Sequence, residues 1–131
     1  MVVDASAVIS VVGAEADASE MLRTMQAHSE HLHMAPFNWL ETWTKAYREK
    51  DEALLVALER FYGQLPIQIV ATDATQSYIA RTAYDRYGKG TGHRAKLNMG
   101  DCFAYALAKA LDEPLLFKGD DFVHTDVRSA L

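Results

Sequence analysis

The fold is decided by residues 97–117, which read LNMGDCFAYALAKALDEPLLF. From about Met99 to Leu111 the apolar residues recur at helical spacing, and Leu115-Leu116-Phe117 is a short apolar run typical of a buried strand. The chain opens with a similar run, Val2-Val3, which predicts another buried strand, followed by a polar turn at Asp4-Ala5-Ser6. Short buried strands separated by helices indicate an α/β fold, in which helices cover both faces of a parallel sheet.

The intervening sequence continues this alternation of helices and strands. Helices are expected over residues 15–27, 36–50, 51–64 and 73–88, and further strands over residues 31–35 and 67–71. Pro36 suits the first turn of its helix, and Asp73 can cap the helix that ends at Gly88. In the helix over residues 36–50, the expected core stripe consists of Trp39, Trp43, Ala46 and Tyr47. No linker or repeat interrupts the pattern, so one domain over residues 1–131 is expected.

The composition is that of a globular protein. Of the 131 residues, 50% are hydrophobic and 24% are charged, which argues against disorder or a fibrous repeat. The net charge of −5 argues against a protein that coats nucleic acid indiscriminately. A single cysteine, Cys102, excludes an internal disulfide framework and fits a reducing cytoplasm. The apolar opening contains Asp4 and has no basic region, so neither a signal peptide nor a membrane span is expected.

Acidic residues follow two of the expected strands. In open parallel sheets, sites form beyond the carboxyl ends of strands, where the strand order switches direction. Asp4 follows the first strand, and Asp120 and Asp121 follow the last. Each also has a purely structural explanation, because Asp4 can cap the turn after it, and an acidic pair after a glycine is common in turns.

Two further acids lie on expected helices. Asp101 begins its helix on a face shared with the apolar residues Ala104, Tyr105 and Ala108. A buried carboxylate is costly without a partner, and few basic residues are placed to meet this one, so a metal ion is a reasonable partner. Glu41 lies off the expected core stripe and has Lys45 four residues on, so a solvated ion pair is the simpler interpretation of this residue from the pattern alone.

The segment from Arg81 to Lys96 is the clearest departure from even mixing of charge. It has one acid, Asp85, with tyrosines and glycines interleaved, and its basic residues are Arg81, Arg86, Lys89, Arg94 and Lys96. A solvated loop is the simplest interpretation. Basic side chains on a flexible backbone beside an acidic site would also suit a phosphodiester strand.

Several stretches together resemble the PIN-domain toxins of the VapC family, the ribonuclease halves of bacterial VapBC toxin–antitoxin pairs. They occur in order over essentially the whole chain: residues 2–7 (VVDASA), 40–41 (LE), 97–108 (LNMGDCFAYALA) and 113–122 (EPLLFKGDDF). The resemblance implies an α/β/α sandwich with a mainly parallel central sheet. It also implies an endoribonuclease that depends on Mg²⁺ or Mn²⁺ and acts on cytoplasmic RNA, with a VapB-type antitoxin as partner and a homodimer within that complex.

The same resemblance implies roles for individual residues. The catalytic set comprises Asp4, Glu41, Asp101 and Asp121. Within it, Asp4 and Asp101 match the two metal-binding aspartates, and Glu41 matches a helix glutamate. Asp121 is the better match to the fourth acid because relatives often have asparagine at the position of Asp120. Ser6 matches a hydroxyl residue beside the first acid.

Two other functions remain open from the sequence. A phospho-acceptor signalling domain of the receiver type also has acids at strand ends and a lysine after a late strand, as Lys118 is here. Such a domain has two adjacent acids after its first strand, whereas here only Asp4 follows Val3. The second alternative is a PIN-like module that binds RNA or protein without cutting, against which the complete set of acids argues.

Overall fold

The computed structural model describes all residues from Met1 to Leu131. Its centre is a parallel sheet of four two-residue strands in the order β3-β2-β1-β4. The strands are β1 (Val2–Val3), β2 (His33–Met34), β3 (Gln68–Ile69) and β4 (Leu115–Leu116). The helices are α1 (Ala5–Val12), α2 (Ala18–Ala27), α3 (Pro36–Glu49), α4 (Glu52–Gln64), α5 (Ala74–Tyr87) and α6 (Met99–Leu111), followed by the 3₁₀ helix η1 (Phe122–His124).

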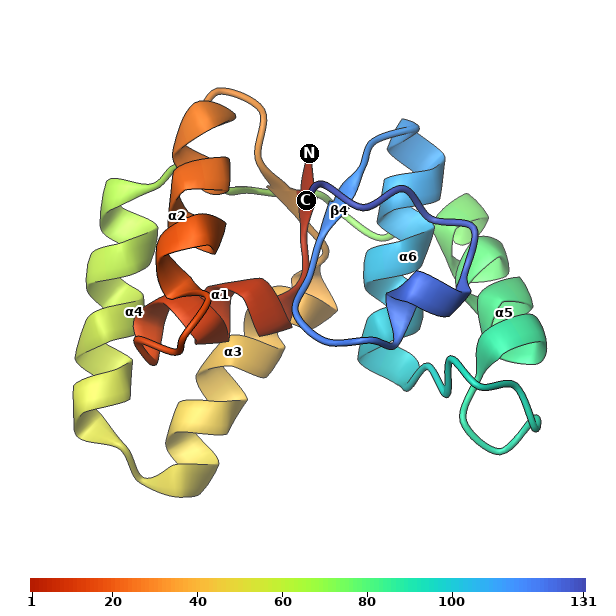
Figure 1. Ribbon diagram of the computed structural model, residues 1–131, viewed down its shortest axis with the longest axis horizontal. Coiled ribbons are helices and arrows are strands. Elements are labelled where there is room, and N and C mark those ends of the chain that lie inside the picture. The colour runs from red at the N-terminus through yellow and green to blue at the C-terminus, as the bar shows by residue number, and fades with distance from the viewer.

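The helices form a layer on each face of the sheet. Helices α1 to α4 lie on one side, and α5 and α6 lie on the other (Figure 1). Successive strand residues point to opposite faces. Val3 and Leu116 accordingly belong to the core under α1–α4, whereas Val2 and Leu115 belong to the core under α5 and α6. The expected α/β/α sandwich with a parallel sheet is confirmed.

The strand order places a switch point between β1 and β4. From β1 the chain moves outward through β2 to β3, and it then returns to pair β4 with the opposite side of β1. The crevice beyond the carboxyl ends of β1 and β4 is therefore where a site is expected. Receiver domains have the different strand order 2-1-3-4-5. The receiver-type alternative is therefore wrong.

Two expectations about helices were also wrong. Residues 4–6 are not a polar turn, because Asp4 caps α1, accepting a hydrogen bond from the Ser6 amide at 2.9 Å. In α3 the buried residues are Asn38, Thr42 and Ala46, whereas Trp39 and Tyr47 of the expected stripe are exposed. Burial of the polar pair is tolerated because both side chains donate hydrogen bonds, Thr42 to the Trp39 carbonyl and Asn38 to Asp4.

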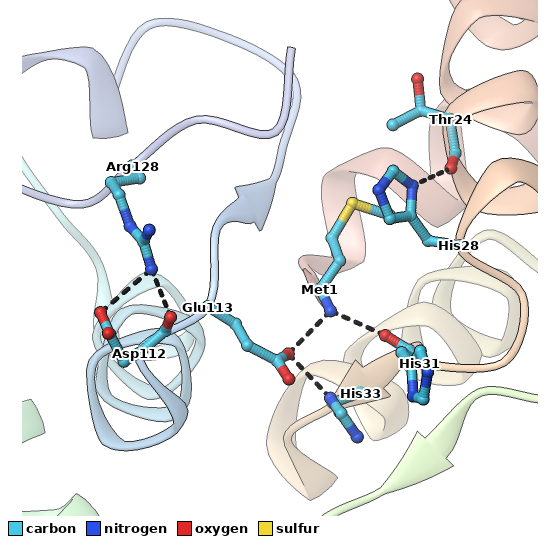
Figure 2. Close-up of polar contacts among 8 residues, drawn as sticks. All are labelled: Met1, Thr24, His28, His31, His33, Asp112, Glu113 and Arg128. Atoms are coloured by element: carbon cyan, nitrogen blue, oxygen red, sulfur yellow. Dashed lines mark hydrogen bonds and ion pairs between the residues drawn. The ribbon is translucent and has the colours of Figure 1, made fainter.

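An ion pair and a hydrogen bond hold the amino-terminal ends of the strands together (Figure 2). The Glu113 carboxylate meets the Met1 amine at 2.7 Å and the His33 ring at 2.8 Å, and so joins β1, β2 and the turn before β4. The final residues also pair with β4, because the Leu115 amide donates to the Arg128 carbonyl at 2.8 Å.

None of the helices combines the length and apolar character that crossing a membrane requires.

Candidate active site

A pocket of about 480 Å³ opens beyond the carboxyl ends of β1 and β4. Its lining includes four acids from different parts of the chain: Asp4, Glu41, Asp101 and Asp121. We call this hollow the acidic pocket. No lysine, arginine or histidine forms an ion pair with any of these carboxylates. Asp120 is exposed and does not line the pocket, so of the two neighbouring aspartates only Asp121 faces the other acids.

Asp4 forms the floor of the acidic pocket. The residue is only 4% exposed, and its carboxylate accepts hydrogen bonds from the Ser6 hydroxyl at 2.5 Å and from the Asn38 amide group at 3.1 Å. Burial raises the pKa of Asp4, the hydrogen bonds from Ser6 oppose that rise, and the charge of Asp121 adds to it. Asp4 is thus both the cap of α1 and a pocket residue, which unites the two interpretations that its sequence position allowed.

Asp101 occupies the first turn of α6, where it completes a capping box with Asn98. The Asn98 amide donates to the Asp101 carboxylate at 2.8 Å, and the Asp101 amide donates to the Asn98 side chain at 2.9 Å. Burial raises the pKa of Asp101 to about 7, opposed by the Asn98 hydrogen bond and reinforced by the charges of Asp4, Asp121 and Glu41. The acids are therefore close enough to repel one another.

Glu41 reaches the pocket from α3, and its carboxylate accepts no hydrogen bond. Burial and the charge of Asp4 raise the pKa of Glu41, while Arg48 lowers it. Its side chain passes over Gly100, where an added Cβ would lie 2.8 Å from Glu41 Oε2. The expected Glu41–Lys45 pair is wrong, because Lys45 instead meets Glu49 at 2.5 Å.

Asn38 is a site residue that the sequence did not reveal. It is fully buried, and its side-chain amide donates to Asp4 and to the Gly100 carbonyl at 3.0 Å, so it links the end of β1 to α6. The usable signal was its spacing: Asn38, Thr42 and Ala46 recur every four residues along α3 and so share one face of that helix. The aromatic residues between them concealed this face.

Cationic side chains line the pocket at its rim: Lys45, Arg48 and Lys118. Lys45 is paired with Glu49, and Lys118 is paired with Glu15 and Asp17. Arg48 forms no ion pair and is exposed. The acidic floor with a cationic rim is suited to a phosphate group whose charge is shared between a bound cation and side chains.

The donor set of the pocket fits a hard divalent cation. All four side chains offer carboxylate oxygens, the ligands that Mg²⁺ and Mn²⁺ prefer, and their mutual repulsion is relieved by positive charge. No three His, Cys, Asp or Glu side chains are gathered closely enough to enclose an ion by themselves. Mg²⁺ usually binds one or two carboxylates and completes its coordination with water and phosphate oxygens.

Comparison with known proteins identifies the family. The PIN domain family model matches residues 1–128. Ribonuclease VapC42 of Mycobacterium tuberculosis is 40% identical over 130 residues, which cover 99% of this chain and 98% of that protein. Ribonuclease VapC of Mycolicibacterium smegmatis is 43% identical over 127 residues, 97% of each chain.

A solved structure agrees in fold. The crystal structure of Mycobacterium tuberculosis VapC20, a Sarcin-Ricin loop cleaving toxin, matches with a TM-score of 0.74 at 15% identity, covering 96% of this chain and 95% of that one. The family model and the sequence relatives identify the family, and the solved structure agrees with it in fold. The chain belongs to the PIN domain family, and within that family to the VapC proteins.

Proposed function

We propose that this protein is the toxin of a type II toxin–antitoxin pair, an endoribonuclease that cleaves cellular RNA in the acidic pocket. The observation that carries the proposal is the convergence of Asp4, Glu41, Asp101 and Asp121 at the β1–β4 switch point, without any cationic partner. Relatives named as ribonucleases that align with nearly the whole chain support RNA as the substrate.

The ion in this proposal is Mg²⁺, with Mn²⁺ as a substitute, and Asp4 and Asp101 are the residues that hold it. When bound, such an ion neutralises charge on the phosphate and lowers the pKa of a coordinated water. Ser6 and Asn38 fix the orientation of the Asp4 carboxylate through their hydrogen bonds. Asp101 is fixed in the same way by the Asn98 amide.

Glu41 is the residue placed to accept a proton. Neither of its carboxylate oxygens accepts a hydrogen bond within the protein, and its raised pKa keeps it a stronger base than an ordinary glutamate. Asp121 adds negative charge beside Asp4 and Asp101. Arg48, without a carboxylate partner, is available to a phosphate oxygen at the rim.

The test is cleavage of a single-stranded RNA by wild-type protein and by Asp101→Asn, each with Mg²⁺ and with a chelator. The asparagine side chain keeps an oxygen that can accept the Asn98 hydrogen bond but loses the charge, so we expect a folded protein whose cleavage is slower by about a hundredfold or more. Asp120→Asn, which neutralises the neighbouring acid outside the pocket, is the matched control and should cleave normally.

Three results would contradict this assignment. A folded Asp101→Asn protein with full activity would remove Asp101 from the site. Undiminished cleavage in chelator would remove the metal. Binding of RNA by wild-type protein without cleavage in Mg²⁺ or Mn²⁺ would instead favour the alternative of a PIN-like binding module.

The partner in this proposal is a VapB-type antitoxin that blocks the acidic pocket. Four carboxylates without a cation suit an arginine, whose planar guanidinium can pair with two carboxylate oxygens at once. Beside Glu41, α3 exposes apolar side chains that a partner helix can cover: Phe37, Trp39, Leu40 and Tyr47. A toxin homodimer within this complex completes the proposal, and sedimentation of the purified complex tests it.

A further inference from the structure

A second pocket lies beside the acidic pocket, between α5 and the start of α6. It has a volume of about 530 Å³, and the chemistry proposed above does not use it. Most of its lining is apolar, including Tyr84 from α5 and Met99 and Phe103 from α6. Asn98 lines both pockets, so they are neighbours across a single residue. We call this second hollow the base pocket.

The aromatic walls of the base pocket are held in place. The Tyr84 hydroxyl donates to the Lys89 carbonyl at 2.8 Å, and Gly88 packs so closely under the ring that an added Cβ would lie 2.8 Å from it. Phe103 stacks on Phe37 with ring centroids 5.3 Å apart and planes at 25°. Tyr84 is nevertheless 43% exposed and Met99 is 63% exposed, so the pocket presents apolar surface to a ligand.

Positive charge borders the same pocket. Arg81 and Lys89 are part of its lining, and neither forms an ion pair within the protein. An apolar slot with uncommitted cations at its edge matches a planar, uncharged ring that is attached to an anionic backbone. That is the chemistry of a single-stranded nucleic acid, whose bases stack on aromatic side chains while its phosphates meet lysine and arginine.

We propose that the base pocket receives an unpaired nucleobase of the RNA, next to the phosphodiester that lies in the acidic pocket. In a nucleotide the base and the phosphate are joined through one sugar, and the two pockets likewise adjoin at a shared lining residue, Asn98. Tyr84, Met99 and Phe103 contact the base, and Arg81 and Lys89 meet the neighbouring phosphates. This site determines which nucleotide is accepted beside the cleaved bond, and it rests on the proposed ribonuclease function.

The experiment pairs protein variants with RNAs that each lack a single base. Wild-type protein is assayed on a single-stranded RNA and on a series in which one abasic ribose is moved along the strand. We expect one abasic position beside the cleaved bond to lower kcat/KM by about tenfold. The double variant Tyr84→Ala, Met99→Ala should lose about tenfold on intact RNA and nothing further on that abasic RNA.

Two control variants separate stacking from structural damage. Tyr84→Phe loses the hydroxyl contact with Lys89 but keeps the ring, and it should retain most of the discrimination against the abasic RNA. Tyr78→Ala removes another exposed tyrosine of α5 that lies outside the base pocket, and it should behave as wild type. The single variant Met99→Ala, at a highly exposed position, tests the pocket if the double variant does not fold.

The proposal is overturned if the variants lower kcat/KM on the abasic RNA by the same factor as on intact RNA. The base that is missing from the abasic RNA would then not be one that the base pocket holds. It is also overturned if the variants alter self-association in sedimentation but still discriminate against the abasic RNA, which would make the pocket a contact between copies of the chain. Fluorescence anisotropy measures how tightly Asp101→Asn binds the same RNAs, without any need for cleavage. If the abasic RNA binds as tightly as the intact RNA, the base pocket is refuted. If the wild type binds RNA but does not cleave it, only the ribonuclease function is refuted.

Discussion

At the scale of single residues, Gly100 shows how a missing side chain positions a carboxylate. An added Cβ would lie 2.8 Å from Glu41 Oε2 and 3.2 Å from the Phe37 ring. Gly100→Ala should therefore displace Glu41 and slow RNA cleavage by up to about a hundredfold. The close contacts cost stability, whereas alanine is favoured over glycine in a helix by about 1 kcal/mol. Because these two effects oppose each other, the free energy of unfolding should change by less than about 1 kcal/mol.

The matched control for this variant is Gly63→Ala. Gly63 lies in α4 with no atom near its would-be Cβ, so this change should leave cleavage untouched and stabilise the protein slightly. RNA cleavage and urea unfolding, measured on both variants, separate the local contact from the general effect of alanine. Equal activities for the two variants would show that Glu41 does not depend on the space above Gly100.

The pKa of Asp101 predicts how stability depends on pH without metal. That pKa is about 7 in the folded protein, against 3.8 as its ordinary value. Between these values the folded state binds a proton that the unfolded chain has released, so the free energy of unfolding falls as pH rises from about 4 to about 7. Asp101→Asn cannot ionise and should be more stable than wild type near pH 8, by on the order of 1 kcal/mol for this partly exposed group.

Urea unfolding in the presence of a chelator measures this difference at about pH 8 and at about pH 4.5. The advantage of Asp101→Asn should shrink at the lower pH, where Asp101 of the wild type is protonated. Mg²⁺ should stabilise the wild type at the higher pH and have less effect on the variant. An advantage that is the same at both pH values would show that repulsion among the acids is not its cause.

For the acidic pocket, the sequence predicted which acids line it but not the contacts around them. Asp4 stood out because it follows the first strand, and Asp101 because a carboxylate on an apolar helix face needs a partner; both line the acidic pocket. The pairing of Glu41 with Lys45 was wrong because helical spacing allows Lys45 two partners, and the fold selects Glu49. Asn38 was missed because its burial depends on Asp4, from a strand distant in the sequence.

At the scale of elements, most helices and strands were predictable, and the failures have physical causes. Helix α1 follows β1 directly within one apolar run, so only Asp4 separates strand from helix, and no change of hydrophobic pattern marks the boundary. On α3 the large aromatic residues suggested the wrong face. The exposed Trp39 ring packs edge-on against Trp43 at 5.9 Å, on the surface, whereas the buried side chains of Thr42 and Asn38 donate hydrogen bonds inside.

The basic segment from Arg81 to Lys96 covers the end of α5 and the loop after it, and here the structure sharpens a prediction. Arg86 and Lys89 both belong to this segment, but the two residues face different surroundings. Lys89 lines the base pocket, whereas the Arg86 guanidinium lies 4.9 Å from the centre of the Tyr87 ring and lines a separate hollow. Lys89→Glu should therefore weaken binding more and reduce its dependence on salt by about one phosphate contact.

RNA affinity measured over a range of salt concentrations checks this prediction, in an Asp101→Asn background that is expected to cleave slowly. Arg86→Glu is the comparison, since it changes net charge by the same amount in the same segment. Identical salt dependence for both variants would mean that the segment acts only through its total charge. Unchanged affinity in both would make it a solvated loop.

At the scale of the whole molecule, the acidic pocket and the exposed face of α3 together predict how the protein is inhibited. A partner that places an arginine among Asp4, Glu41 and Asp101 competes with the divalent ion, so inhibition should weaken as Mg²⁺ is raised. RNA cleavage by a co-purified complex, titrated with Mg²⁺, measures this. Replacing the arginine that the partner places in the acidic pocket should restore cleavage. Full activity of the intact complex would refute inhibition at the pocket.

The pairing of β1 with β4 also determines when the acidic pocket can form during synthesis of the chain. Asp4 is synthesised long before β4, but the Ser6 hydroxyl that donates to it accepts a hydrogen bond from the backbone amide of Lys118, 112 residues after Ser6. At translation rates of about 5–20 residues per second, this interval is roughly 6–22 s. During that time the growing chain has neither β4 nor Asp121, so the acidic pocket lacks the side that they form. A ribosome making this protein is therefore not exposed to a finished acidic pocket until β4 and Asp121 have been synthesised.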